Sequence, residues 1–323
     1  MSGLPIVSST VIYLSGIMAI VLSVSTTIIN TSLLFVIVKD PLKCLRKPST
    51  GFITSLALTN LAFGLVTDTT YAMALFEGLG SGYVNMDLKT IQTASGFFTF
   101  TSVVVVIVAL TVECLLGTLF PIFHRNCITF KSSILVSCGV WAYALLFTMM
   151  QFADINFEVY ELLDTHLHHT VPFGAILLCY LFIYRGLRKR TRACAPKNAS
   201  NQQTEAGELK FHKQLLLTVI LVGLLLFLTL VPFQVTLTMM KRCLTCDINK
   251  LYASFLVSLN FMYTNPALNT LLYAWRTRPF RRSFRAMFCR GRDLDLRHSK
   301  LMASQRSTSG GGFSKPGKTG NEH

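Results

Sequence analysis

The feature that most constrains the fold is a series of seven apolar segments, each long enough to cross a lipid bilayer. A helix rises about 1.5 Å per residue, so about 20 residues cross a hydrocarbon core of roughly 30 Å. Backbone polar groups in a bilayer must be satisfied within the protein, and these runs far exceed the length of barrel strands. The sequence therefore predicts an all-α membrane protein, a bundle of seven transmembrane helices. The segments lie at about 11–38, 50–76, 90–119, 132–152, 165–187, 212–240 and 251–275.

The composition excludes a soluble domain of this length. Hydrophobic residues make up 51% of the 323 residues and charged residues only 14%. The mean hydropathy is +0.50. Soluble globular domains have about a quarter of their residues charged, so the chain is expected to reside in a membrane.

The basic residues predict the orientation in the membrane. The net charge of +15 also suits nucleic-acid binding, but 26 of the 30 Lys and Arg residues lie in the first, third and fifth connections and the C-terminal tail. By the positive-inside rule these parts face the cytoplasm and the N-terminus faces outside. The basic inner surface would face anionic membrane lipid, so nucleic acid is not expected as a partner. We expect a multi-pass protein of the plasma membrane with an extracellular N-terminus.

Four regions follow from this topology. They are a short extracellular N-terminus (1–10), the seven-transmembrane domain (11–275), an amphipathic cytoplasmic helix (276–290) and a disordered cytoplasmic tail (291–323). The third region is predicted from its spacing, because Phe280, Phe284, Met287 and Phe288 recur at i, i+4, i+7 and i+8 while three arginines lie off that stripe. Such a helix suits the membrane interface, with membrane lipid as its partner.

Polar residues and prolines recur inside the apolar segments. A polar side chain there costs free energy, so each is a functional candidate, with an interhelical hydrogen bond as the structural alternative. In chain order the landmarks are Asn30, Asn60, Trp141, Pro172, Tyr180, Pro232, Asn269 and Tyr273. Their order and spacing over about residues 30 to 289, with seven segments and an outer N-terminus, resemble the rhodopsin-like (class A) G-protein-coupled receptors.

The resemblance implies a cell-surface receptor that binds an extracellular small-molecule, lipid or peptide ligand and acts on a heterotrimeric G protein and arrestin. It assigns activation and coupling to Asn30, Asn60, Glu113, Cys114, Tyr180, Pro232, Asn269 and Tyr273. In the last segment Asn269 and Tyr273 match the family's Asn-Pro-x-x-Tyr motif. Thr270 replaces its proline and Pro266 supplies one a turn earlier, so the kink is expected to be shifted.

The stretch "ALTVEC" resembles the family's Asp/Glu-Arg-Tyr motif at the cytoplasmic end of the third helix. Glu113 is retained, but Cys114 stands where the family has its arginine. The resemblance assigns that arginine an ion pair at rest and a G-protein contact in the active state, so weak or atypical coupling is expected here. Asn60 replaces the family's second-helix Asp, and with Val103 on the third helix it makes the family's sodium pocket an unlikely feature, because an amide cannot offset a buried cation.

The ligand pocket of this fold is expected among the outer halves of the third, fifth, sixth and seventh helices. Its candidate residues are Gly96, Phe97, Phe100, His168, His169, Phe233, Gln234, Phe255 and Tyr263. Aromatic packing is the structural alternative for the rings. Gly96 stands where amine receptors carry Asp, and Tyr263 stands at the position of the retinal lysine. Neither a biogenic amine nor retinal is therefore expected.

Cysteine placement departs from the family pattern. The second outer loop contains no cysteine, so the common disulfide to the third helix is absent. Together with the pair Cys243 and Cys246, this resembles the melanocortin, adenosine and lysophospholipid receptors. These two cysteines face an oxidising compartment and are predicted to form a local disulfide, with two free thiols as the alternative. Cys289 resembles the family's palmitoylation site.

The sequence also bears on functions other than that of a receptor, namely those of an enzyme, a metal site, a transporter or a scaffold. The sequence has no nucleophile motif, no H-E-x-x-H and no Gly-rich phosphate loop, so an enzyme is not expected, and no cofactor or metal is required. His166, His168 and His169 could bind zinc or respond to pH, or form interhelical hydrogen bonds. A seven-helix transporter, or a scaffold that does not couple to G proteins, is the alternative, although neither internal repeats nor broken helix pairs are evident.

Overall fold

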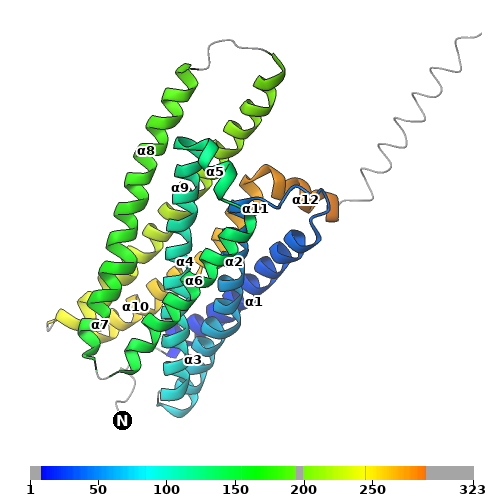
Figure 1. Ribbon diagram of the computed structural model, residues 1–323. Helices are drawn as coiled ribbons and strands as arrows, with labels where there is room; N and C mark the ends of the chain where they lie inside the picture. The colour runs from blue at the N-terminus through cyan, green and yellow to red at the C-terminus, as the bar shows by residue number, and fades with distance from the viewer. Residues whose placement is uncertain (1–8, 84, 154, 194–198, 244, 289–323) are drawn as a thin grey trace, which may run out of the picture.

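A computed structural model describes residues 9–83, 85–153, 155–193, 199–243 and 245–288, and all regular structure within them is helical (Figure 1). In this described part, six helical runs are long and apolar enough to cross a membrane. The seventh predicted segment forms two shorter helices in succession, α10 and α11. The predicted seven-helix bundle is confirmed.

The described residues form twelve α-helices. They are α1 (Ser9–Lys39), α2 (Pro48–Ala62), α3 (Thr69–Ser81), α4 (Met86–Leu119), α5 (Pro121–Cys127), α6 (Phe130–Met149), α7 (Phe157–Asp164), α8 (Val171–Ala193), α9 (Ala199–Arg242), α10 (Ile248–Tyr263), α11 (Asn265–Arg276) and α12 (Arg278–Phe288). A π-helical segment η1 (Phe63–Asp68) joins α2 to α3, and another, η3 (Thr165–Thr170), joins α7 to α8.

Several helix ends follow directly from the sequence. The side chain of Asn85 accepts hydrogen bonds from the backbone N–H groups of Asp87 and Leu88 and so caps α4. Thr129 and Ser132 form a capping box at the start of α6. Pro266 lies in the first turn of α11, where its missing N–H is tolerated, and the seventh segment accordingly breaks at Thr264.

The central helix of the bundle is α4, which packs against α2, α6, α8 and α9. The bundle has one end that carries α5 and α12 and an opposite end that carries α7, which we call the α12 end and the α7 end (Figure 1). α8 and α9 extend beyond the other helices at the α12 end. Functional positions on α4 are therefore distributed along the full depth of the bundle.

The amphipathic helix predicted over 276–290 is α12. Its apolar stripe packs partly on the bundle, because Phe280 is only 2% exposed and Phe284 and Met287 contact the core cluster that contains Phe52 and Tyr273. The stripe therefore does more than face lipid, the role expected for an interfacial helix. Cys289 and the predicted tail 291–323 lie outside the described residues, as do residues 1–8.

Candidate functional site

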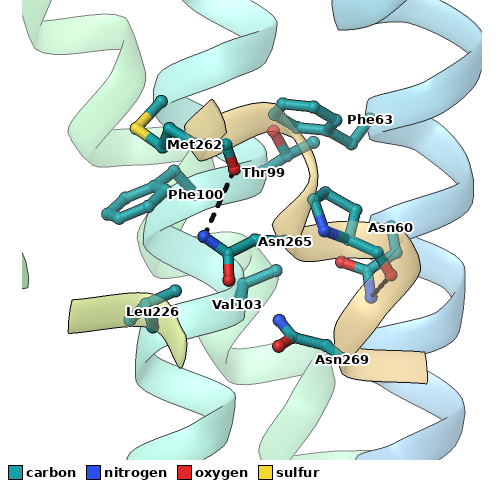
Figure 2. A pocket seen from close by; sticks show the side chains of 10 residues that line it. Asn60, Phe63, Thr99, Phe100, Val103, Leu226, Met262, Asn265 and Asn269 are labelled. Carbon is teal, nitrogen blue, oxygen red and sulfur yellow. Dashed lines mark hydrogen bonds between the residues drawn. The ribbon is translucent and has the colours of Figure 1, made fainter. Parts of the chain in front are cut away.

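A small cavity of about 20 Å³ lies between α2, α4, α9 and the broken seventh segment (Figure 2). It is lined by Asn60, Phe63, Thr99, Phe100, Val103, Leu226, Met262, Asn265, Pro266 and Asn269. This volume is enough for about one water molecule. The break at Thr264 positions Asn265 and Asn269 at the cavity, because both belong to the first two turns of α11.

A chain of hydrogen bonds connects three helices beside this cavity. The Thr270 hydroxyl donates to Oδ1 of Asn30 at 2.6 Å, and Nδ2 of Asn60 donates to Oγ1 of Thr270 at 3.4 Å and to the Pro266 carbonyl at 3.2 Å. Nδ2 of Asn30 in turn donates to the Thr26 carbonyl at 2.8 Å. Sequence reasoning missed the part of Thr270, which it treated only as the residue that replaces a proline.

Several amide atoms at the cavity are buried and have no hydrogen-bond partner within the described chain. These are Oδ1 of Asn60, Oδ1 of Asn265, and both Oδ1 and Nδ2 of Asn269. Nδ2 of Asn265 is satisfied by Thr229 and by the Met262 carbonyl, the latter shown as a dashed line in Figure 2. Buried amides are usually hydrogen-bonded, so these atoms form a site suited to an ordered water. No carboxylate lines the cavity among the described residues.

The predicted ligand residues on α4 and η3 lie together towards the α7 end. The rings of Phe100 and His169 are 5.1 Å apart, and the ring of Phe97 lies 5.0 Å from that of Tyr160 on α7. Phe100 also lines the cavity, so it joins this aromatic group to the polar network. Nδ1 of His169 is buried without a partner in the described chain. A Cβ at Gly96 would meet only the methyl group of Thr67, at 3.7 Å.

His168 points to a different neighbour from His169. Its Nδ1 lies 2.8 Å from Oδ1 of Asp164, and its Nε2 lies 2.9 Å from the hydroxyl of Tyr143 on α6. With both ring nitrogens engaged and only 1% of the residue exposed, His168 fixes α6 against η3. Of the two predicted ligand histidines, only His169 contacts another predicted ligand residue through a described ring contact. His166 is exposed, and no metal-binding group of three residues occurs among the described residues.

Three of the remaining predicted ligand residues belong to one hydrophobic cluster, in which Phe233 and Phe255 pack against a core that contains Tyr263. Phe233 of α9 lies 5.6 Å from Phe255 of α10. Tyr263 instead faces η1, α3 and α4: its hydroxyl accepts a hydrogen bond from Gln92 at 3.1 Å, and its ring lies 4.9 Å from Phe63. Gln234 is partly buried, and Pro232 is exposed on α9. Phe233, Phe255 and Tyr263 thus lie in one cluster, while Phe100 and His169 lie in the aromatic group towards the α7 end.

Glu113 lies near the α12 end of α4 and has a partner that the sequence reasoning did not identify. Its Oε1 is 2.7 Å from Nε2 of His124, on the short helix α5 that follows α4. Glu113 is 4% exposed, so the contact is largely shielded from solvent. A histidine eleven residues after the motif is a weak sequence signal, because only the turn between α4 and α5 brings the two side chains together.

Cys114 is part of the main core cluster and is 1% exposed. Its thiol lies 3.9 Å from Oε2 of Glu113. Tyr273 belongs to the same cluster, and Tyr180 packs against it. Cys114 of α4, Tyr180 of α8 and Tyr273 of α11 therefore share one hydrophobic cluster.

At the α7 end, Cys243 and Cys246 form a disulfide with their Cα atoms 5.6 Å apart. The bridge closes the short connection between α9 and α10. Nearby, Lys241 at the end of α9 forms an ion pair with Glu161 of α7 and lies over the ring of Phe157 at 6.0 Å. These contacts connect the ends of α7 and α9.

Comparison with known proteins adds an independent result. The family profile described as "7 transmembrane receptor (rhodopsin family)" matches residues 29–273. The neuropeptide F receptor of Drosophila melanogaster is 23% identical over 305 residues, covering 83% of this chain and 60% of the relative. The chain thus spans about 60% of the length of that curated relative.

The structure of squid rhodopsin has a similar fold. Its TM-score is 0.75 at 14% sequence identity, and the superposition covers 89% of this chain and 82% of the squid chain. At this sequence identity the similarity concerns the fold.

Proposed function

Because the chain belongs to the rhodopsin family of seven-transmembrane receptors, we propose that it is a cell-surface receptor that signals through heterotrimeric G proteins. This family consists of receptors, and the chain is not an enzyme. It is a multi-pass membrane protein, and we place its α7 end outside the cell and its α12 end in the cytoplasm, from the distribution of Lys and Arg.

The observation that carries the proposal is the position of Phe100. Its ring contacts His169 on the outer side and also lines the cavity that Asn60 and Asn269 share. A ligand that displaces Phe100 or His169 would therefore act directly on the hydrogen-bonded core that joins α1, α2 and α11. The similarity to a neuropeptide receptor favours a peptide ligand, with a lipid or another small molecule as the alternative.

The contact between Glu113 and His124 bears on coupling. Without an arginine at position 114, the motif lacks a long cationic side chain that can turn towards a G protein. We infer that coupling is weaker than in receptors that carry the arginine, and that His124 provides the resting partner of Glu113. We also propose arrestin as a partner, membrane lipid as the partner of α12, and Cys289 as the site of lipidation.

The experiment that tests the proposal is G-protein dissociation in cells, measured for each G-protein class with and without ligand libraries. The proposal predicts activation above that of cells lacking the protein. A transporter would instead move solute across reconstituted proteoliposomes. Flux without any G-protein response at normal surface expression would contradict the receptor function, and absence of both would favour a scaffold.

A further inference from the structure

Asp68 is the last residue of η1, at the junction where the π-helical segment passes into α3. Its side chain is fully buried, with 0% of the residue exposed. Neither carboxylate oxygen has a hydrogen-bond partner within the described chain, and no ion pair to Asp68 occurs there. A buried carboxylate with both oxygens unsatisfied is unusual in a folded protein.

The other two carboxylates buried in the described chain make this exception clear. Glu113 is 2.7 Å from His124, and Asp164 is 2.8 Å from His168. Each has a nitrogen partner supplied by the protein. Asp68 alone of the three lacks one, although Lys and Arg residues are abundant elsewhere in the chain.

The surroundings of Asp68 are aromatic. Asp68 directly precedes α3 with helical backbone angles, and Tyr71 follows it by three residues, so both side chains lie on the same side of this helical run. The ring of Tyr263 lies 5.3 Å from that of Tyr71 and 4.9 Å from that of Phe63, edge to face in both cases. The Tyr71 hydroxyl is also buried without a partner in the described chain.

A buried, unpaired carboxylate among aromatic rings is suited to binding a cation. A carboxyl group that is removed from water and left unpaired is strongly destabilised in its charged form. A cation bound beside it compensates for the lost solvation. Aromatic rings add cation–π attraction, and the free Tyr71 hydroxyl can accept a hydrogen bond from an N–H group. We propose that Asp68 is the counter-ion for an amine or guanidinium group of the extracellular ligand, bound among Tyr71, Tyr263 and Phe63. This inference rests on the proposed receptor function and specifies its ligand class.

This site differs from the one in amine receptors, which carry their Asp on α4 at the position of Gly96. The carboxylate is presented by the neighbouring transmembrane run, on the side of the bundle formed with α10. A ligand cation at Asp68 would contact Tyr263, which is the last residue of α10 and directly precedes the break at Thr264. Binding of the ligand cation would in this way act on α11 and on the cavity.

The first arm of the test measures the thermal stability of the purified, ligand-free chain. Asp68→Asn keeps the shape and removes the uncompensated charge, so its Tm is expected to equal or exceed that of the wild type. Asp164→Asn is the matched control, which weakens the contact to His168 and is expected to lower the Tm by several degrees. A fall in Tm for Asp68→Asn as large as that of the control would show an internal partner and overturn the proposal.

The second arm uses two probes that differ mainly in charge, 1-(2-phenylethyl)guanidine and (2-phenylethyl)urea. The guanidine is expected to raise the Tm of the wild type, to lose this effect in Asp68→Asn and to retain part of it in Asp68→Glu. The urea is expected to have no effect on any of them. Equal stabilisation of wild type and Asp68→Asn by the guanidine, equal effects of the two probes, or no stabilisation by either would overturn the proposal.

Basal G-protein activation of the wild type distinguishes this failure from failure of the proposed function. If the wild type activates G protein without ligand while the guanidine fails to bind, the receptor function stands and the cation site is wrong. If the wild type activates no G protein under any condition, the proposed function itself is contradicted.

Discussion

Glu113 is partnered by a histidine of the following helix and not by the residue next to it in the chain. With Cys114 beside it, Glu113 has no guanidinium available from the next position, and its Oε1 is instead 2.7 Å from Nε2 of His124. The contact holds α5 against the end of α4. Because both side chains are mostly shielded, the pair is better placed to restrain this end of the bundle than a surface ion pair would be.

Replacing His124 tests this restraint. His124→Ala removes the partner of Glu113, and even about 1 kcal/mol, the upper value for an exposed pair, shifts a two-state population about fivefold. We therefore expect basal G-protein activation to rise by about fivefold or more at equal surface expression. The exposed His166, at the opposite end, offers the control His166→Ala, which should leave basal activity unchanged. Unchanged activity in His124→Ala as well would mean that the contact does not restrain the receptor.

Among the elements, the hydrogen bonds through Thr270 connect α1, α2 and α11. They explain how a helix broken at Thr264 is still held firmly against the bundle, since Thr270 bonds Asn30 and accepts from Asn60. The bonds are fully buried, with each of the three residues at most 2% exposed. Loss of the hydroxyl would leave Oδ1 of Asn30 without its donor, and Nδ2 of Asn60 would keep only the Pro266 carbonyl.

Thr270→Ala is accordingly expected to destabilise the folded protein by about 1–3 kcal/mol, the cost of leaving buried polar groups without partners. Thr270→Ser keeps the hydroxyl and should lose much less. The measurement is the Tm of the purified protein in detergent. Equal Tm values for the alanine and serine variants would show that the hydroxyl contributes little.

The helices themselves were predictable from sequence, because apolar length and the requirement for internal hydrogen bonding dictate them. The shifted break of the seventh helix was also predictable, since Pro266 marks it. The π-helical segments were not. A π-helical turn contains more residues than an α-helical turn and so changes where its side chains point. His168 and His169 lie within η3, where His168 contacts Tyr143 and His169 contacts Phe100. Apolar periodicity alone carries no signal for such a turn.

The candidate site was predictable in part for the same reason. Residues on one helix face, such as Phe97 and Phe100, could be grouped by spacing, and they do lie against neighbouring rings. Contacts between helices, such as Tyr263 with Gln92, depend on how far each helix is rotated and shifted. Tertiary packing makes His124 the partner of Glu113 and buries Asp68 without a partner in the described chain. A single sequence does not specify such packing.

For the whole molecule, the orientation in the membrane is the assumption on which both the ligand site and the coupling end depend. The charge distribution predicts that an epitope at residue 2 is labelled on intact cells and that one at residue 323 is labelled only after permeabilisation. An epitope placed in the short connection near residue 247 should be labelled like that at residue 2. Surface labelling of residue 323 would reverse the assignment of the two ends.

We infer that the coupling of this receptor to G proteins is limited by the cysteine at position 114. Restoring the guanidinium with Cys114→Arg should provide both a partner for Glu113 and the missing active-state contact, and a buried, well hydrogen-bonded arginine is worth more than an exposed pair. Cys114→Ser is the control, since it adds no charge.

The most direct measurement is therefore G-protein dissociation in cells that express wild type, Cys114→Arg or Cys114→Ser at equal surface levels. The account predicts greater basal or ligand-dependent activation for Cys114→Arg than for the other two. A Cys114→Arg protein that reaches the surface normally but activates G protein no better than wild type and Cys114→Ser would contradict it.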